Sequence, residues 1–532
     1  MDKEKGNPDA GLRSLDHYKI MLPRWRYILR EQLIPIVRWE TPYVAWLQST
    51  LRSPALDTYF AMSANLGTHT FFNIMLPIWF WCGYTDLGRG MTHILAMGVF
   101  FSGFIKDLVC LPRPLSPPLQ RITMSGSAAL EYGFPSTHST NAVSVAVYAI
   151  LLLRENSAEL SPNMSLAIQV LAYFYACSIV LGRLYCGMHG FFDVVFGSAL
   201  GAALGLLQFA YGPVFDEWFF AGNMKRVLLV ILSILVLVRI HPEPADDCPC
   251  FDDSVAFAAV VIGVEFGTWH FAKSPHSWSY PSHGTVPFDL ERMGWLVAVA
   301  RILLGVVVVF AWRGVMKPLL LKSLPPLFRI IEQLGLSLPR RFFKPASQYK
   351  TVPRQRHDDN VIPYARDIPE LISSLRRRRA VSIGPQSEAD AYETLAYREK
   401  RRRDSLTANG SPNSPKRISP ERGYVGDQTT DGNVSQSGGR KRSSSLEMFR
   451  AQMGTGMDSL SPQPVRSPPE VDGKGTSDLD ELQAKSLFSS IQRPRVRYDV
   501  EVVTKLIVYS GIAWWSVEGN PLLFKYIGLG ME

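Results

Sequence analysis

Apolar runs long enough to cross a lipid bilayer recur along much of the chain. A spanning helix needs roughly 20 apolar residues, because the hydrocarbon layer is about 30 Å thick. Inside lipid every backbone N–H and C=O must be paired within its own segment, and these runs lack the alternation of barrel strands, so each predicts an α-helix. The predicted spans lie near residues 57–84, 90–106, 138–154, 165–184, 191–211, 224–240, 254–272 and 293–313.

The composition reverses between residues 348 and 497, where Ser, Pro, Gly, Arg and Lys dominate. Such a segment has too little apolar surface to offset the entropy of ordering, so we expect it to be disordered. Residues 502–515 are apolar again and predict either a ninth span or an interfacial helix docked on the bundle. The predicted fold class is all-α, a polytopic membrane helix bundle of about eight or nine spans with a long disordered insertion.

These patterns divide the chain into predicted units. Between residues 24 and 51, aromatic and aliphatic side chains are interleaved with arginines, which indicates either helices in the headgroup layer or packing against the bundle. The predicted units are a cytosolic or interfacial region at 1–56, a membrane domain at 57–315, a juxtamembrane segment at 316–347, the disordered region at 348–497 and a C-terminal membrane-associated helix at 498–532.

The net charge of +9 comes largely from the two ends and the insertion. It favours attraction to anionic lipid, and the sequence carries no nucleic-acid recognition motif. Basic runs precede Ser382, Ser405 and Ser443, which is typical of kinase substrates facing the cytosol, although chance matches in a Ser-rich segment explain them equally well. The predicted partners are therefore a membrane lipid substrate, the bilayer, and kinases acting on the insertion.

Three short polar stretches occur where predicted spans meet water: Lys106 to Pro114, Pro135 to His138, and Arg183 to Asp193. They fall at the end of the second span, the start of the third, the end of the fourth and the start of the fifth. Because consecutive spans alternate in direction, all of these positions emerge on one side of the membrane. The polar groups of the three stretches can therefore converge.

The cations of these stretches suit a phosphate ester. Its transition state spreads negative charge over three oxygens, and fixed cations and N–H donors stabilise that charge. Arg113 and Arg183 can each bind two oxygens, Lys106 supplies a point charge and Ser136 a hydroxyl. The helix starts beside them are expected to offer further N–H groups. With the oxygens neutralised in this way, the chemistry requires no metal and no cofactor.

The two histidines suit covalent catalysis. Asp193 lies one helical turn after His189, so its carboxylate can hold the Nδ1 proton and direct Nε2 at phosphorus, which would form a phosphohistidine. His138 would donate a proton to the leaving alkoxide and later activate water. Each motif also has a structural explanation by itself: cations at span ends reach for headgroups, Ser136 is an N-cap, and a His–Asp pair can be a capping pair.

K-x6-RP, PSxH and R-x5-H-x3-D together resemble the signature of the type 2 phosphatidic acid phosphatase superfamily, which also contains the vanadium haloperoxidases. The resemblance implies that Lys106, Arg113, Ser136 and Arg183 bind phosphate, that His138 is the general acid, and that His189 and Asp193 are the nucleophile and its orienting group. The family commonly has Ser before the arginine of the third motif, whereas this chain has Gly182.

The stretches GFPSTHSTNAVS, GRLYCGMHGFFD and HPEPADDCPCFDDSVAF resemble more narrowly the fungal long-chain-base-1-phosphate phosphatases. This branch implies a multi-pass endoplasmic reticulum enzyme of sphingolipid metabolism with a lumenal site. The charge pattern and span count instead place the site in the cytosol. A broader lipid phosphate or phosphatidate phosphatase, a non-catalytic lipid-phosphate carrier and a haloperoxidase-like oxidant are the alternatives.

Two further hypotheses concern acidic residues. The first assigns selection of the substrate ammonium of a sphingoid base phosphate to the loop after the sixth span, with an ordinary solvated loop as the alternative. The second pairs Glu265 with Arg301, since lone charges at equal depth in adjacent spans are costly. Cys248 and Cys250, which lie in the loop after the sixth predicted span, lack the spacing of a metal site. The acidic side chains of that loop are Asp246, Asp247, Asp252 and Asp253.

Overall fold

A computed structural model describes residues 11, 15–67, 69–116, 118–122, 131–156, 160–246, 248–336, 340, 343–352 and 497–531. Within these ranges the chain is almost entirely helical, with one short parallel pair of strands, so the all-α prediction is confirmed. The elements are α1 (Leu15–Met21), α2 (Arg24–Leu51), α3 (Pro54–Ser63), η1 (Ala64–Gly67), α4 (His69–Trp81), α5 (Thr85–Val109), α6 (Thr137–Glu155), α7 (Pro162–Tyr185), α8 (Phe191–Phe220), α9 (Met224–Ile240), α10 (Cys250–Ala272), α11 (Leu290–Met293), α12 (Trp295–Gln333), β1 (Phe343–Lys344), η3 (Ala346–Gln348), β2 (Arg497–Tyr498), α17 (Val500–Trp514), the π-helical turn η5 (Trp515–Gly519) and α18 (Asn520–Tyr526).

Six helices of the described part are long and apolar enough to cross a membrane: α5, α7, α8, α10, α12 and the continuous α17–α18 segment. The last of these contains the apolar stretch predicted at 502–515, and its 27 residues are enough for a span. Helices α6 and α9 coincide with the predicted spans at 138–154 and 224–240 but fall outside this criterion of length and hydropathy. The first predicted span, 57–84, is broken into α3, η1 and α4.

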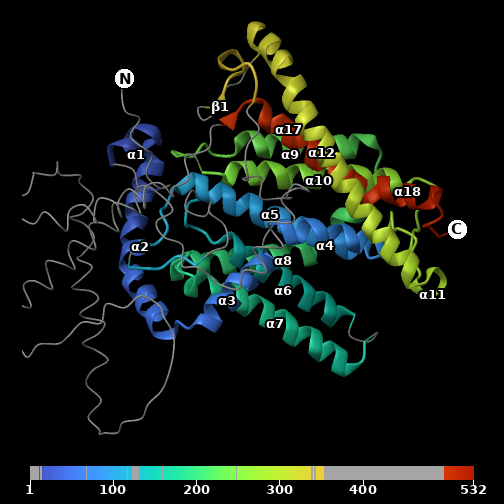
Figure 1. Ribbon diagram of the computed structural model, residues 1–532, viewed down its shortest axis with the longest axis horizontal. Helices are drawn as coiled ribbons and strands as arrows, with labels where there is room; N and C mark the ends of the chain where they lie inside the picture. The colour runs from blue at the N-terminus through green and yellow to red at the C-terminus, as the bar shows by residue number, and fades with distance from the viewer. Residues whose placement is uncertain are drawn as a thin grey trace, which may run out of the picture.

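Helix α2 lies across one end of the bundle, at the left of Figure 1, while α11 and the C-terminus lie at the other end. Arg26 on α2 donates from Nε to the Leu108 carbonyl at 2.7 Å, and Gln48 donates to the Tyr185 carbonyl at 2.8 Å. These bonds satisfy carbonyls at the ends of α5 and α7 that have no partner within their own helices. Of the two alternatives for residues 24–51, α2 therefore packs against the bundle, although Trp39 still exposes 65% of its surface.

Glycines allow α6 and α8 to lie in close contact. A Cβ at Gly197, Gly201 or Gly205 of α8 would come within 2.6, 2.2 and 2.9 Å of the carbonyl oxygens of Ser136, Thr140 and Ser144 on the α6 side. Small residues at every fourth position let helix backbones approach in a membrane. This stripe fixes the start of α6 against the start of α8, where two of the predicted motifs lie.

The predicted Glu265–Arg301 ion pair is wrong. Glu265 on α10 instead binds Arg89 on α5, with Oε2 and Nη2 2.7 Å apart, and also contacts His93. Arg301 on α12 donates to the Pro287 carbonyl at 3.1 Å. The physical reason is that α17 contacts both α10 and α12 and separates them, while α10 packs directly on α5. The buried charge is still paired, as expected, but by a different helix.

Candidate active site

The three polar motifs meet at the end of the bundle that α2 covers (Figure 1). Lys106 is in the last turn of α5, Arg183 is in the last turn of α7, and Ser136 caps α6. His189 lies in the short link between α7 and α8, and Asp193 is in the first turn of α8. The convergence predicted from alternating span directions is confirmed for these groups.

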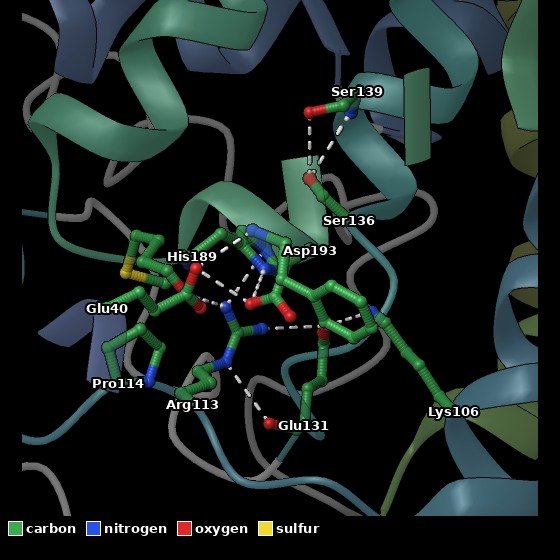
Figure 2. A network of polar contacts seen from close by, with 12 residues as sticks. Glu40, Lys106, Arg113, Pro114, Glu131, Ser136, Ser139, His189 and Asp193 are labelled. Atoms are coloured by element: carbon green, nitrogen blue, oxygen red, sulfur yellow. Dashed lines mark hydrogen bonds and ion pairs between the residues drawn. The ribbon is translucent and has the colours of Figure 1, made fainter. Parts of the chain in front are cut away.

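His189 is held on both sides of its ring (Figure 2). Arg113 Nη1 lies 3.1 Å from Nε2, and the Asp193 carboxylate lies 3.4 Å from Nδ1. A guanidinium can only donate, so Nε2 must be the unprotonated nitrogen and Nδ1 carries the proton toward Asp193. The lone pair of Nε2 is therefore directed toward the cationic side of the site.

The surroundings of His189 also keep the ring neutral. Burial is the largest cause that lowers the pKa of His189 well below its usual range, followed by the positive charges of Arg113 and Lys106. The charges of Arg183 and His138 act in the same direction, so both groups are within electrostatic reach of the ring. A neutral imidazole is the form that can attack phosphorus.

Lys106 and Arg113 form a cationic cradle that is almost completely buried. They expose 3% and 5% of their side chains, and both contact one carboxylate oxygen of Glu131. That oxygen lies 3.3 Å from Lys106 Nζ and 3.2 Å from Arg113 Nη2 (Figure 2). The sequence motifs did not include Glu131, and its position four residues before Pro135 gives no spacing signal.

The start of α6 is bonded directly to the start of α8. Ser136 N donates to the Asp193 carbonyl at 3.0 Å, and Ser136 Oγ accepts from Ser139 N at 3.4 Å and from the Ser139 hydroxyl at 3.0 Å. Ser136 is thus the N-cap of α6, which was the structural explanation of this motif residue, and its side chain is fully buried and turned toward Ser139 (Figure 2). His138 lies in the first turn of α6 and is half-buried.

The N–H groups at the start of α8 are not open to an anion, contrary to our expectation. Gly190 N donates to the Asp193 carboxylate at 3.1 Å, and Phe192 N donates to Glu40 at 2.9 Å. Burial raises the pKa of Glu40 to about 7. Glu40 comes from α2, far from the motifs in sequence, which is why sequence analysis missed it.

Arg183 completes the set of predicted phosphate ligands. Its side chain is 6% exposed, and its Nε has no hydrogen-bond partner among the described residues. A buried guanidinium with an unused donor can still bind an anion.

The acidic loop lies beside the site, but two of its carboxylates are already bound. Asp246 Oδ2 accepts from Tyr18 at 2.9 Å and from Tyr132 at 3.0 Å, and Asp252 pairs with Arg497 at 3.0 Å and Lys505 at 2.9 Å. Both aspartates are buried. Side chains of the protein itself therefore occupy both carboxylates. Asp253 is half-buried in the first turn of α10, and Asp247 lies outside the described residues.

Asp107, Cys248 and Cys250 could hold a metal ion, because one ligand atom from each lies within 4.8 Å of the others and all three are buried. The basic side chains Arg497 and Lys106 are among the charges that act on Asp107 in this cluster. Asp107 follows Lys106 of the cradle directly in the chain, whereas the side chains that contact the His189 ring are Arg113 and Asp193.

Comparison with known proteins identifies the family of this chain. The family model described as the PAP2 superfamily matches residues 89–215, which include all three motifs. A dihydrosphingosine 1-phosphate phosphatase of Schizosaccharomyces pombe is 41% identical over 323 residues, which cover 61% of this chain and 75% of the relative. This chain belongs to the PAP2 superfamily. No solved structure matches it.

Other relatives of this PAP2 chain carry similar names. A dihydrosphingosine 1-phosphate phosphatase of Saccharomyces cerevisiae is 33% identical over 58% of this chain and 74% of the relative. Human sphingosine-1-phosphate phosphatase 2 is 25% identical over 53% of this chain and 72% of the relative. The resemblance stated from the motifs is therefore confirmed at the level of the superfamily and its fungal members.

Proposed function

We propose that this multi-pass membrane protein hydrolyses sphingoid long-chain base 1-phosphates to the free base and inorganic phosphate. The substrate class rests on the names of the fungal relatives and on the PAP2 match over the three motifs. The observation that carries the chemistry is the position of His189 between Arg113 and Asp193, which leaves a neutral nitrogen facing a cationic cradle. The resemblance to the fungal long-chain-base-1-phosphate phosphatases leads us to propose the endoplasmic reticulum membrane as its location.

The first step is attack of His189 Nε2 on phosphorus. Arg113 turns from Nε2 to a phosphate oxygen, and Lys106 and Arg183 bind the remaining charge. The P–O bond to the lipid breaks as the P–N bond forms, and His138 gives its proton to the leaving alkoxide. Asp193 stabilises the positive charge that develops on the His189 ring. The products of this step are the free base and a phosphohistidine.

The second step reverses these roles. His138, now neutral, takes a proton from water, and the water oxygen attacks phosphorus as the P–N bond breaks. Phosphate leaves and His189 returns to its neutral form. All charge compensation comes from side chains of this protein, so the proposed reaction needs no divalent ion.

The test is competition between dihydrosphingosine 1-phosphate and phosphatidate in one detergent assay with EDTA. We expect preferential release of phosphate from the sphingoid substrate, unchanged by EDTA, and a loss of at least about 1000-fold in His189→Ala. Equal use of phosphatidate would favour the broader lipid phosphatase. Binding without phosphate release would favour a carrier, and inhibition by EDTA would contradict the metal-free mechanism.

A further inference from the structure

Glu131 occupies a position that the proposed chemistry does not explain. Its Oε2 lies 3.3 Å from Lys106 Nζ and 3.2 Å from Arg113 Nη2, between the two cations that would bind a phosphate oxygen (Figure 2). Its side chain is 29% exposed, whereas those of its two partners are 3% and 5% exposed. Glu131 is thus the member of this trio that an incoming headgroup reaches first.

A carboxylate at this position repels a phosphate. Both are anions that bind the same two cations, and repulsion between like charges is strong in a buried site. A substrate whose headgroup carries only negative charge must displace Glu131 and leave it unpaired next to the phosphate, which is costly. The site therefore disfavours a purely anionic headgroup such as that of phosphatidate.

A sphingoid base phosphate removes this cost, because its ammonium is on the carbon next to the one that bears the phosphate. We propose that Glu131 binds the substrate ammonium and selects sphingoid base phosphates over lipid phosphates that lack one. On binding, the phosphate takes over Lys106 and Arg113, while the Glu131 carboxylate exchanges these partners for the ammonium. This inference rests on the proposed function, since it names the specificity group of the same site.

The acidic loop is a weaker source of the same selectivity. Asp246 and Asp252 are buried and bound to tyrosines and basic side chains of the protein. Asp253 is half-buried on α10, and Asp253→Asn therefore provides the matched comparison for Glu131→Gln.

The experiment compares kcat/KM for dihydrosphingosine 1-phosphate and for its N-acetyl derivative, which differs in lacking the ammonium. We expect wild type to prefer the amine, and Glu131→Gln to lower this preference at least about tenfold, because one charge-assisted hydrogen bond is lost. The N-acetyl substrate should retain or gain activity in Glu131→Gln, which also shows that the variant is folded. Asp253→Asn should keep the wild-type preference.

Three other outcomes would overturn the inference. Equal changes for both substrates in Glu131→Gln would mean that Glu131 only positions Lys106 and Arg113. Loss of preference in Asp253→Asn but not in Glu131→Gln would assign the role to the loop. No preference in wild type would remove the selectivity itself. Failure of wild type to release phosphate from either substrate would instead contradict the proposed function.

Discussion

His189 is neutral in this site for a reason that can be measured. Its pKa is held well below the usual range by burial and by the neighbouring cations Arg113 and Lys106. Protonation of the ring would place a further positive charge among them, so the attacking form persists into acidic solution. The acidic limb of the activity profile should therefore lie below the pKa of about 6.5 that an ordinary histidine has.

Lys106→Met should move this limb to higher pH. Removing a nearby positive charge relieves repulsion of the protonated ring, so the pKa of His189 rises and activity near pH 6 falls relative to activity at pH 8. The measurement is kcat/KM against pH for wild type and variant, each normalised to its own maximum. An acidic limb that stays in place, or moves to lower pH, would contradict this electrostatic account.

At the residue scale the sequence predicted the motif side chains but not their neighbours. Lys106, Arg113, His189 and Asp193 could be grouped because their spacing and span directions are visible in the sequence. Glu131 could not, because nothing in a linear pattern says which way a loop carboxylate turns. Its contacts with Lys106 and Arg113 appear only in the folded chain, where the three side chains meet.

At the scale of elements, the packing of α6 on α8 positions the catalytic groups. Gly201 lies where a Cβ would come within 2.2 Å of the Thr140 carbonyl, so Gly201→Leu must push the two helices apart. We expect an activity loss of at least about tenfold, since small displacements of reacting groups are costly. Gly314→Leu is the matched control, because nothing lies within 4 Å of a Cβ there. Similar losses in both variants would show that the glycine stripe has no special role.

The contact of α2 with α8 predicts a pH dependence of stability. Burial raises the pKa of Glu40 from 4.5 to about 7. Between these values the folded protein holds a proton that the unfolded chain has released, so the Glu40 contribution to stability falls as pH rises through this window. Glu40→Gln should abolish this loss of stability at higher pH. It should raise the free energy of unfolding above pH 7 by roughly 1–3 kcal/mol.

The measurement is the thermal midpoint in detergent at pH 5.5 and pH 8. The Gln carbonyl can still accept from Phe192 N–H, so the contact with α8 is kept. The account predicts that Glu40→Gln raises the thermal midpoint relative to wild type by more at pH 8 than at pH 5.5. A larger increase of the thermal midpoint at pH 5.5 would contradict the raised pKa of Glu40.

The helices with long apolar runs could be predicted from the sequence, but the helices against which they pack could not. The runs near 191–211 and 254–272 became α8 and α10, because hydropathy alone determines that such segments are helical in lipid. The Glu265–Arg301 prediction failed because it assumed that consecutive spans pack together. A helix from the far end of the chain, α17, lies between them, and sequence order carries no trace of that insertion.

At the scale of the whole molecule, the site and the ends of the long insertion lie at the same end of the bundle. Arg497, just after the insertion, pairs with Asp252 at 3.0 Å, and Asp252 begins α10 near the acidic loop. The residues between 353 and 496, including the predicted kinase sites, lie outside the described residues. Since α12 ends and α17 begins at this end (Figure 1), both connections to the insertion are on the side of the site.

We therefore predict that the insertion and the active site face one compartment. The test uses sealed vesicles of each orientation, an external protease and a short-chain substrate that does not cross the membrane. The protease should cleave an epitope at 400–440 only in the vesicles that hydrolyse this substrate. Cleavage of the epitope in vesicles that do not hydrolyse the external substrate would contradict this arrangement. The sequence could not decide which compartment this is, because its basic segments favour the cytosol and the family resemblance implies the lumen.

The central claim is that His189 attacks the phosphorus of a sphingoid base phosphate. Its most direct test is an alkaline quench of the purified protein during turnover of radiolabelled dihydrosphingosine 1-phosphate, followed by mapping of the labelled peptide. The account predicts acid-labile, base-stable label on His189 and none in His189→Ala, which should also release no phosphate. Label on another residue, or phosphate release at the wild-type rate in His189→Ala, would contradict it.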